Sequence, residues 1–246
     1  MALRDTHTDE SVAEAIGLLK RALIIDPNYA PAKALIGWSR IHHGSHGRSR
    51  LTEAEQAEAA ALAREALDSG KDDPDTLWMA GFTLLSYAGQ RDVAAAAVDR
   101  ALTLHPNSAH AWAVRGYVSL SLDQTGPAIE ALERAMRLSP LDSLRRAFTN
   151  GIAFAHLRER RFEQALDWAE LTLREEPDYR GALLNKAVAS AHLGHTDEAR
   201  ATLRQWIESQ SGITIARWSA IWSRVFSPEK MSIYVEGLRR AGLPEE

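Results

Sequence analysis

The densest group of side chains that could bind a metal ion is His42, His43 and His46, followed closely by Arg48 and Arg50. Imidazole is a common zinc ligand, but a zinc site needs three or four ligands held in a fixed geometry. Two glycines interrupt any helix that could hold these rings, and no carboxylate lies in the same segment. We therefore expect a flexible solvated loop here, with no bound metal.

Other residues with catalytic chemistry are scattered. His192 and His195 flank a glycine where a turn is expected, and the acidic pairs at 72–73 and 175–176 stand at turns, where carboxylates favour the start of the next helix. The sequence contains no glycine-rich phosphate loop, no His-Glu-x-x-His motif and no Gly-x-Ser-x-Gly motif. We predict that this chain is not itself an enzyme and uses no cofactor.

Composition limits the classes of partner. The 246 residues are 45% hydrophobic, which is enough to build a large core. A formal net charge of −4 gives no general attraction to nucleic acid or to an anionic membrane, so neither is an expected partner. There are no cysteines and no apolar run long enough to span a bilayer, and the first residues do not form a signal peptide. We expect a cytoplasmic protein.

A repeated sequence motif determines the expected architecture. A helical segment with alanine or another small residue, closed by proline, occurs four times, ending at Pro27, Pro106, Pro140 and Pro177. Two of these prolines are 34 residues apart, as are two tryptophans, Trp78 and Trp112. A fixed period of this length is typical of stacked helical repeats, and no stretch alternates as a strand would. The sequence therefore predicts an all-α chain.

Five complete helix pairs are expected, near residues 30–70, 75–108, 109–142, 143–179 and 180–211. Capping boxes are predicted at Ser11 with Glu14 and at Thr52 with Glu55. The segment 11–27 is a second helix without a first. Either the chain starts inside a longer array, which we favour, or it has a frayed natural start. Extra residues fall at 44–51, at 70–73 and at 141–146, where we expect turns.

Taken together, the repeated residues resemble the tetratricopeptide repeat, a helix-turn-helix unit with Trp, Leu-Gly and Tyr on its first helix and Ala, Phe and Pro on its second. The resemblance implies a right-handed superhelix, or α-solenoid, over residues 1–211, followed by capping helices over 212–246. Small residues would allow close helix packing within and between units. These residues are Gly37, Ala101, Gly116, Ala128, Ala135 and Ala165.

A narrower resemblance concerns the later part of the chain. The segments 139–144, 151–163, 214–218 and 234–244 are similar to the C-terminal repeat region of bacterial class III adenylate or guanylate cyclases. Similar tails also follow winged-helix transcriptional regulators. This resemblance implies a regulatory region of a larger signalling protein, with a catalytic or DNA-binding domain upstream.

The end of the array is expected to need a cap, because the last unit of a solenoid exposes an apolar face. Trp206 replaces the usual small residue, and Trp218 and Trp222 lie on one face of a predicted helix. We interpret these three tryptophans as cap packing. The alternative is an exposed partner site that supports self-association.

In tetratricopeptide arrays the first helices line a concave groove, and the resemblance would make it a binding site for a peptide or helix. The carboxylate clamp of chaperone-binding members is disfavoured, because apolar residues and a histidine occupy its places. An apolar segment, either from the parent chain or from a second copy, fits better. Tyr117 and Phe154 are the expected anchors, with Asn150 and Arg158 orienting the ligand. The expected lining residues are Trp38, His42, Met79, Tyr87, His110, Tyr117, Asn150, Phe154, Arg158, Leu184 and Val188.

Overall fold

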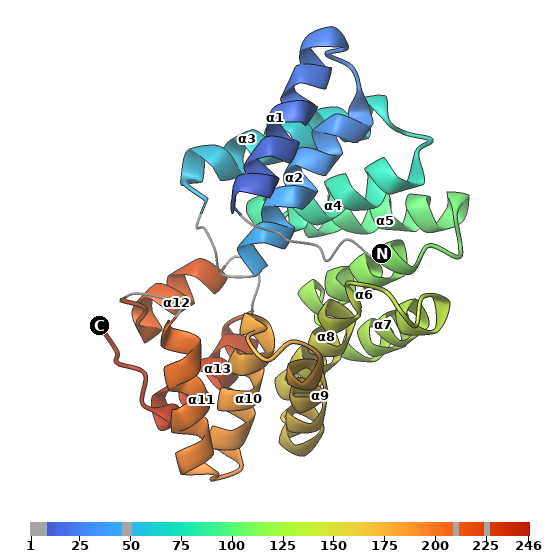
Figure 1. Cartoon of the computed structure of the whole chain (residues 1–246). Helices are drawn as coiled ribbons and strands as arrows, with labels where there is room; N and C mark the ends of the chain where they lie inside the picture. Colours follow the sequence, from blue (N-terminus) through green and yellow to red (C-terminus); the bar gives the residue numbers. More distant parts are fainter. Residues whose placement is uncertain (1–8, 46–50, 209–211, 224–226) are drawn as a thin grey trace. The chain divides into compact units, whose positions relative to one another are not determined.

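The computed structural model describes residues 9–45, 51–208, 212–223 and 227–246. Every regular element in these ranges is an α-helix, as predicted (Figure 1). The helices are α1 (Asp9–Ile25), α2 (Ala30–Ser45), α3 (Glu53–Ser69), α4 (Pro74–Ala88), α5 (Arg91–Leu104), α6 (Ala109–Ser121), α7 (Thr125–Leu138), α8 (Arg145–Arg158), α9 (Phe162–Glu175), α10 (Arg180–His192), α11 (Thr196–Glu208), α12 (Ile215–Trp222) and α13 (Pro228–Ala241). No helix among the described residues is long and apolar enough to cross a bilayer.

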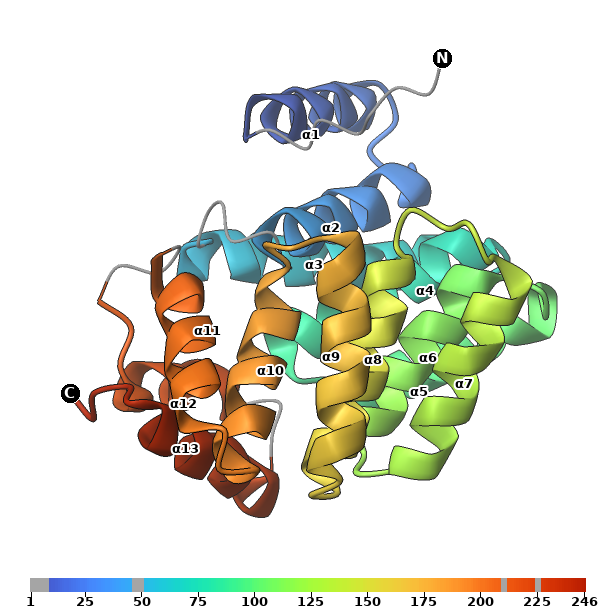
Figure 2. The same ribbon diagram turned by 60° about the horizontal axis from the view of Figure 1, so that its bottom comes forward.

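The helices follow one another in the order expected for paired repeats. The five expected pairs correspond to α2 and α3, α4 and α5, α6 and α7, α8 and α9, and α10 and α11. Helix α1 packs against α2 and has no described helix before it (Figure 2). The even-numbered members from α2 to α10 are therefore first helices, and the odd-numbered members from α3 to α11 are second helices.

Local chemistry explains several helix ends. Thr52 and Glu55 form the predicted capping box, since the Glu55 amide donates to Thr52 Oγ1 (3.2 Å) and the Thr52 amide donates to the Glu55 carboxylate (2.8 Å). The box predicted at Ser11 is wrong, because α1 begins at Asp9 and Ser11 lies inside it. Gly89 ends α4 in the left-handed conformation that glycine adopts without steric cost.

The chain forms two compact units, Met1–Val118 (unit 1) and Ser119–Glu246 (unit 2), and the boundary falls within α6. The expected boundary at 211/212 lies inside unit 2. There α13 contacts α8, α10, α11 and α12, so the last two helices are part of the unit rather than a separate piece.

Small residues allow close approach of helices within unit 1. A Cβ added to Gly37 of α2 would lie 2.6 Å from the Thr83 side chain of α4, and one added to Gly81 would lie 3.1 Å from Ala97 of α5. Ala101 has no exposed surface. These contacts bring neighbouring helices to distances that larger side chains would prevent.

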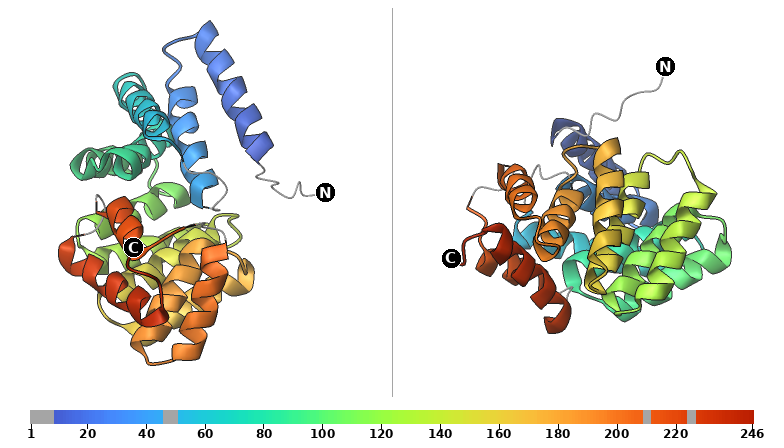
Figure 3. Two further views of the ribbon diagram at one scale, coloured as in Figure 1. Left: turned by 90° about the vertical axis from the view of Figure 1, so that its left-hand side faces the viewer. Right: turned by 90° about the horizontal axis from the view of Figure 1, so that it is seen from below.

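In unit 2 the helices α8 to α11 lie side by side, and Figure 3 shows α13, in dark red, alongside α10. Ala165 of α9 is completely buried, and so are Ala128 and Ala135 of α7, the helix that packs against α8. Trp206 and Trp218 are 3% and 1% exposed and belong to one hydrophobic core that also contains residues of α10, α11, α12 and α13. The half-buried Trp222 packs against this core. The tryptophan-rich end of the chain therefore offers little exposed aromatic surface.

Candidate functional site

A row of aromatic rings crosses three successive first helices of unit 1. We define this aromatic row as Trp38 on α2, Trp78 and Phe82 on α4, and His110 and Tyr117 on α6. The ring centroids lie 4.9 Å apart for Trp38 and Trp78, and 5.9 Å apart for Trp38 and Phe82. The centroid distances are 5.5 Å from Trp78 to His110 and 5.7 Å from Phe82 to Tyr117. Each ring thus touches at least one other in the row.

The row has a buried base and a partly exposed rim. Trp78 is only 5% exposed, and its Nε1 donates to Asp75 Oδ1 (2.8 Å), which fixes the ring. Trp38, Phe82, His110 and Tyr117 are half-buried, so each retains some surface for contact. Aromatic rings in such mutual contact have few alternative rotamers, and a ligand that packs on them loses little entropy in ordering them.

Two further predicted groove residues, Met79 and Tyr87, lie on α4 near the row. Met79 is 8% exposed, and its carbonyl accepts a hydrogen bond from Thr83 (2.8 Å). Tyr87 is half-buried, and this burial raises the pKa of its phenol above the ordinary value, against the opposing effect of Arg40. Tyr87 therefore stays neutral at physiological pH and can act only as a packing or hydrogen-bonding group.

The predicted groove residues of unit 2 are covered by the chain itself. Phe154 packs against Tyr234 of α13, with ring centroids 5.8 Å apart. The Tyr234 hydroxyl donates to Asn185 Oδ1 (2.8 Å), and Asn185 Nδ2 donates to Asn150 Oδ1 (3.0 Å). These two hydrogen bonds form a buried polar ladder that joins α8, α10 and α13. Helix α13 therefore covers the surface of the first helices α8 and α10.

The remaining predicted residues of unit 2 have structural partners. Arg158 is 2% exposed, and its guanidinium donates to the Leu120 carbonyl (2.6 Å) and forms an ion pair with Asp123. Burial lowers the pKa of Arg158, and Asp123 opposes that shift. Leu184 is 8% exposed and Val188 is completely buried. The predicted lining residues therefore divide: Trp38, Met79, Tyr87, His110 and Tyr117 lie in unit 1, and Asn150, Phe154, Arg158, Leu184 and Val188 lie in unit 2.

Histidines do not assemble into a metal site in the part of the chain that the structure describes, where no group of three His, Cys, Asp or Glu residues could hold an ion. The loop expected at His42 and His43 is wrong, because both lie in the last turns of α2; their side chains, and all of His46, lie outside the described residues. His192 stacks on Phe162 with ring centroids 4.3 Å apart, and its Nε2 lies 2.8 Å from the Ile233 carbonyl. Burial lowers the pKa of His192, which is consistent with a packing role.

Two members of the aromatic row, Trp78 and Phe82, are not among the groove residues that the sequence predicts. Phe82 lies 34 residues before Gly116, so it occupies the place of a repeat glycine. A bulky ring at a position that holds glycine in another repeat is the sequence signal that could have identified Phe82 as a groove residue. In the sequence, Trp78 marks only the repeat period, 34 residues before Trp112.

The comparisons with known proteins agree with this architecture. The family model described as "Tetratricopeptide repeat" matches residues 79–143 and 150–212, just over half of the chain. This chain belongs to the tetratricopeptide repeat family. No curated protein sequence matches it.

Several solved structures share the fold at low sequence identity. The chain is similar to a chain of the APC/C Cut9–Hcn1 hetero-tetramer, with a TM-score of 0.67, 15% identity and coverage of 89% of this chain and 40% of that one. It is also similar to PilW, a type IV pilus biogenesis factor (TM-score 0.61, 14% identity, coverage 85% and 92%). A third match is a tetratricopeptide repeat protein from Parabacteroides merdae ATCC 43184 (TM-score 0.55, 15% identity, coverage 94% and 87%). At these identities the matches support the fold alone.

Proposed function

We propose that this protein is a protein-binding scaffold and that the aromatic row of unit 1 is its ligand site. The observation that carries the proposal is the set of partly exposed rings on α2, α4 and α6, each held by contact with another ring. Large rigid aromatic side chains supply much of the binding energy in protein interfaces.

The expected ligand is an apolar helix or an extended segment of a protein. Trp38, Phe82 and Tyr117 offer ring faces and edges, so burial of apolar side chains would drive binding. His110 adds a polar group at one end of the row. In unit 2 the corresponding surface is covered by α13, and for this reason we restrict the site to unit 1.

A random peptide library displayed on phage, selected on the full chain, tests this proposal. The selected peptides should be rich in aromatic and aliphatic residues, and the double variant Phe82→Ala and Tyr117→Ala should bind them at least about tenfold more weakly, since removing each ring face loses buried apolar area. Tyr29→Ala is the matched control, because Tyr29 is also in unit 1 and is 47% exposed but lies outside the row. Undiminished binding by a folded double variant would reject this site.

We further propose that the scaffold is a cytoplasmic regulatory region of a larger signalling protein, as the resemblance to cyclase and winged-helix tails implies. Two residues of that resemblance, Trp218 and Tyr234, lie in the core of unit 2, where their rings stack with centroids 5.3 Å apart. The open reading frame upstream of residue 1 is the test: a cyclase or winged-helix domain in frame supports the proposal, and a stop codon directly upstream refutes it.

A further inference from the structure

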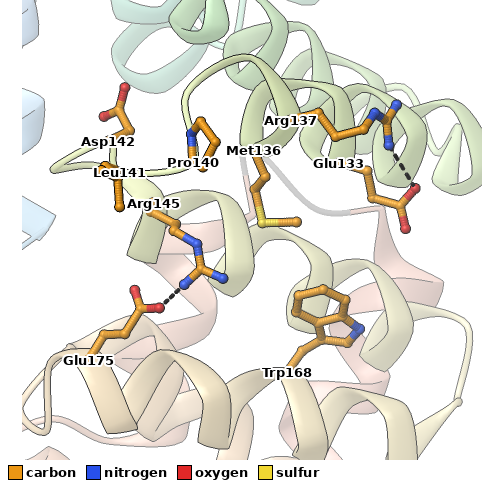
Figure 4. A pocket seen from close by; sticks show the side chains of 9 residues that line it. All are labelled: Glu133, Met136, Arg137, Pro140, Leu141, Asp142, Arg145, Trp168 and Glu175. Carbon is orange, nitrogen blue, oxygen red and sulfur yellow. Dashed lines mark ion pairs between the residues drawn. The ribbon is translucent and has the colours of Figure 1, made fainter.

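A cleft of about 900 Å³ opens between the second helices α7 and α9, away from the aromatic row in sequence and within unit 2. We call it the α7–α9 cleft. Met136 of α7 and Trp168 of α9, both half-buried, supply its apolar surface. Figure 4 shows these two side chains in the middle of the view, with an Arg145–Glu175 ion pair on one side and a Glu133–Arg137 pair (3.8 Å) on the other.

The loop at the rim of this cleft breaks the repeat period. Pro140 and Pro177 are 37 residues apart instead of 34, and α8 starts only at Arg145. Insertions in helical repeat arrays map to loops on one face, which is often a binding face. The insertion therefore marks this cleft as a place where the chain departs from what stacking alone requires.

The loop presents a leucine to solvent in a defined conformation. Leu141 is 98% exposed, more than any other large hydrophobic residue among those described. Its neighbour Asp142 orders the loop: the Leu144 amide donates to Asp142 Oδ1 (2.8 Å), and the Arg145 amide donates to the Asp142 carbonyl (3.0 Å). Leu141 both lines the cleft and extends into solvent from an ordered loop, so one surface carries a projecting side chain and an apolar hollow.

We propose that this surface binds a second copy of the same chain, with Leu141 of each copy inserted between Met136 and Trp168 of the other. A twofold interface requires one self-complementary patch on each subunit, and a projection next to a matching hollow satisfies this requirement. The charges at the rim of the cleft are compatible with binding a second copy, because the rim carries both acidic residues and arginines. Such a mixed rim suits a copy of itself better than a partner of one charge sign.

The dimer is expected to be weak, because one loop and one cleft per copy bury less area than a standard interface. The proposed dimer interface lies in unit 2. The variants that test it therefore do not change the aromatic row of unit 1. The proposal therefore goes beyond ligand binding by the row, and either of the two can fail alone.

Sedimentation velocity of the full chain, from low micromolar to high micromolar concentration, tests the dimer. The wild type should show a concentration-dependent shift from monomer to dimer. Leu141→Asp should raise the dissociation constant roughly 100-fold, about tenfold for each of the two leucines that lose burial. Because Leu141 is almost fully exposed in the monomer, this variant keeps its fold. Ile24→Asp is the matched control, since Ile24 of α1 is 80% exposed in unit 1.

A mixing experiment tests the geometry. Leu141→Asp and Met136→Lys should each remain monomeric alone. Mixed together they should form a heterodimer, because one intact leucine enters one intact cleft and the second contact pairs Asp with Lys. Circular dichroism checks that Met136→Lys is folded.

Dimerisation of the wild type and of Ile24→Asp, with loss in Leu141→Asp and recovery in the mixture, supports the proposal. A wild type that stays monomeric at the highest concentration overturns it. It is also overturned if Ile24→Asp dissociates the dimer while Leu141→Asp does not, or if the folded mixture fails to associate.

Discussion

Gly237 tests how closely α13 is held against the first helices of unit 2. A Cβ at this position would lie 2.5 Å from Val188 Cγ1, 3.2 Å from Val188 Cα and 3.2 Å from His192 Cδ2. Val188 is completely buried and its β-branched side chain has little rotamer freedom, so it cannot move aside. Gly237→Ala should lower the free energy of unfolding by about 1 to 2 kcal/mol: a contact this short falls in the upper part of the overpacking range, about 2 to 3 kcal/mol, and the better helix propensity of alanine returns about 1 kcal/mol.

Urea unfolding followed by tryptophan fluorescence measures this loss, since Trp206, Trp218 and Trp222 all lie in unit 2. Gly126→Ala is the matched control, because an added Cβ there meets no atom within 4 Å. Its stability should be unchanged or slightly higher. In a Val188→Ala background the cost of Gly237→Ala should fall by about 1 kcal/mol, because the clashing methyl group is gone. If Gly237→Ala is stabilising, or its cost is the same in both backgrounds, the close contact of α13 with α10 is refuted.

Three further variants test the packing of the repeats. Ala135→Leu should cost about 1 to 3 kcal/mol and lower the melting temperature, because Ala135 has no exposed surface; an unchanged melt would contradict the packing. Arg158→Ala should cost about 2 to 4 kcal/mol in urea unfolding, less than a fully buried pair would, because the Asp123 side chain is 43% exposed. The hydrogen bond from Lys186 lowers the pKa of Glu198, so this pair stabilises the fold above the ordinary glutamate pKa and loses that effect as pH falls. Lys186→Met should therefore weaken the decline of stability on acidification, and an unchanged pH profile would contradict the pair's role.

Much of the fold could be predicted because a few residue types recur at fixed spacing. Pro106 and Pro140 each follow a second helix by two residues, and Ala101 and Ala135 are both completely buried at equivalent positions. Small side chains at helix crossings and proline after a helix end are local features with direct physical causes. They fix helix pairs without knowledge of distant contacts.

The occupancy of the first-helix surface could not be predicted in the same way. The apolar stripe of α13, which includes Tyr234 and Leu238, fits the end of an array as well as it fits the surface of α8 and α10. The choice depends on contacts between residues far apart in sequence, such as Tyr234 with Phe154 and Asn185. Neither hydropathy nor spacing carries that information, so Phe154 and Val188 were expected in an open groove.

The buried polar ladder explains why α13 takes that position, and it is the reason we propose the ligand site in unit 1 alone. The Tyr234 hydroxyl is completely buried, and a buried hydroxyl without a partner would be costly. Its acceptor, Asn185 Oδ1, belongs to α10, and Asn185 in turn donates to Asn150 of α8. A peptide that replaced α13 with apolar contacts alone would bury the Asn185 oxygen without its Tyr234 donor, so such a peptide would not displace α13. The half-buried aromatic rings of α2, α4 and α6 are the surface on which we propose that an external segment packs.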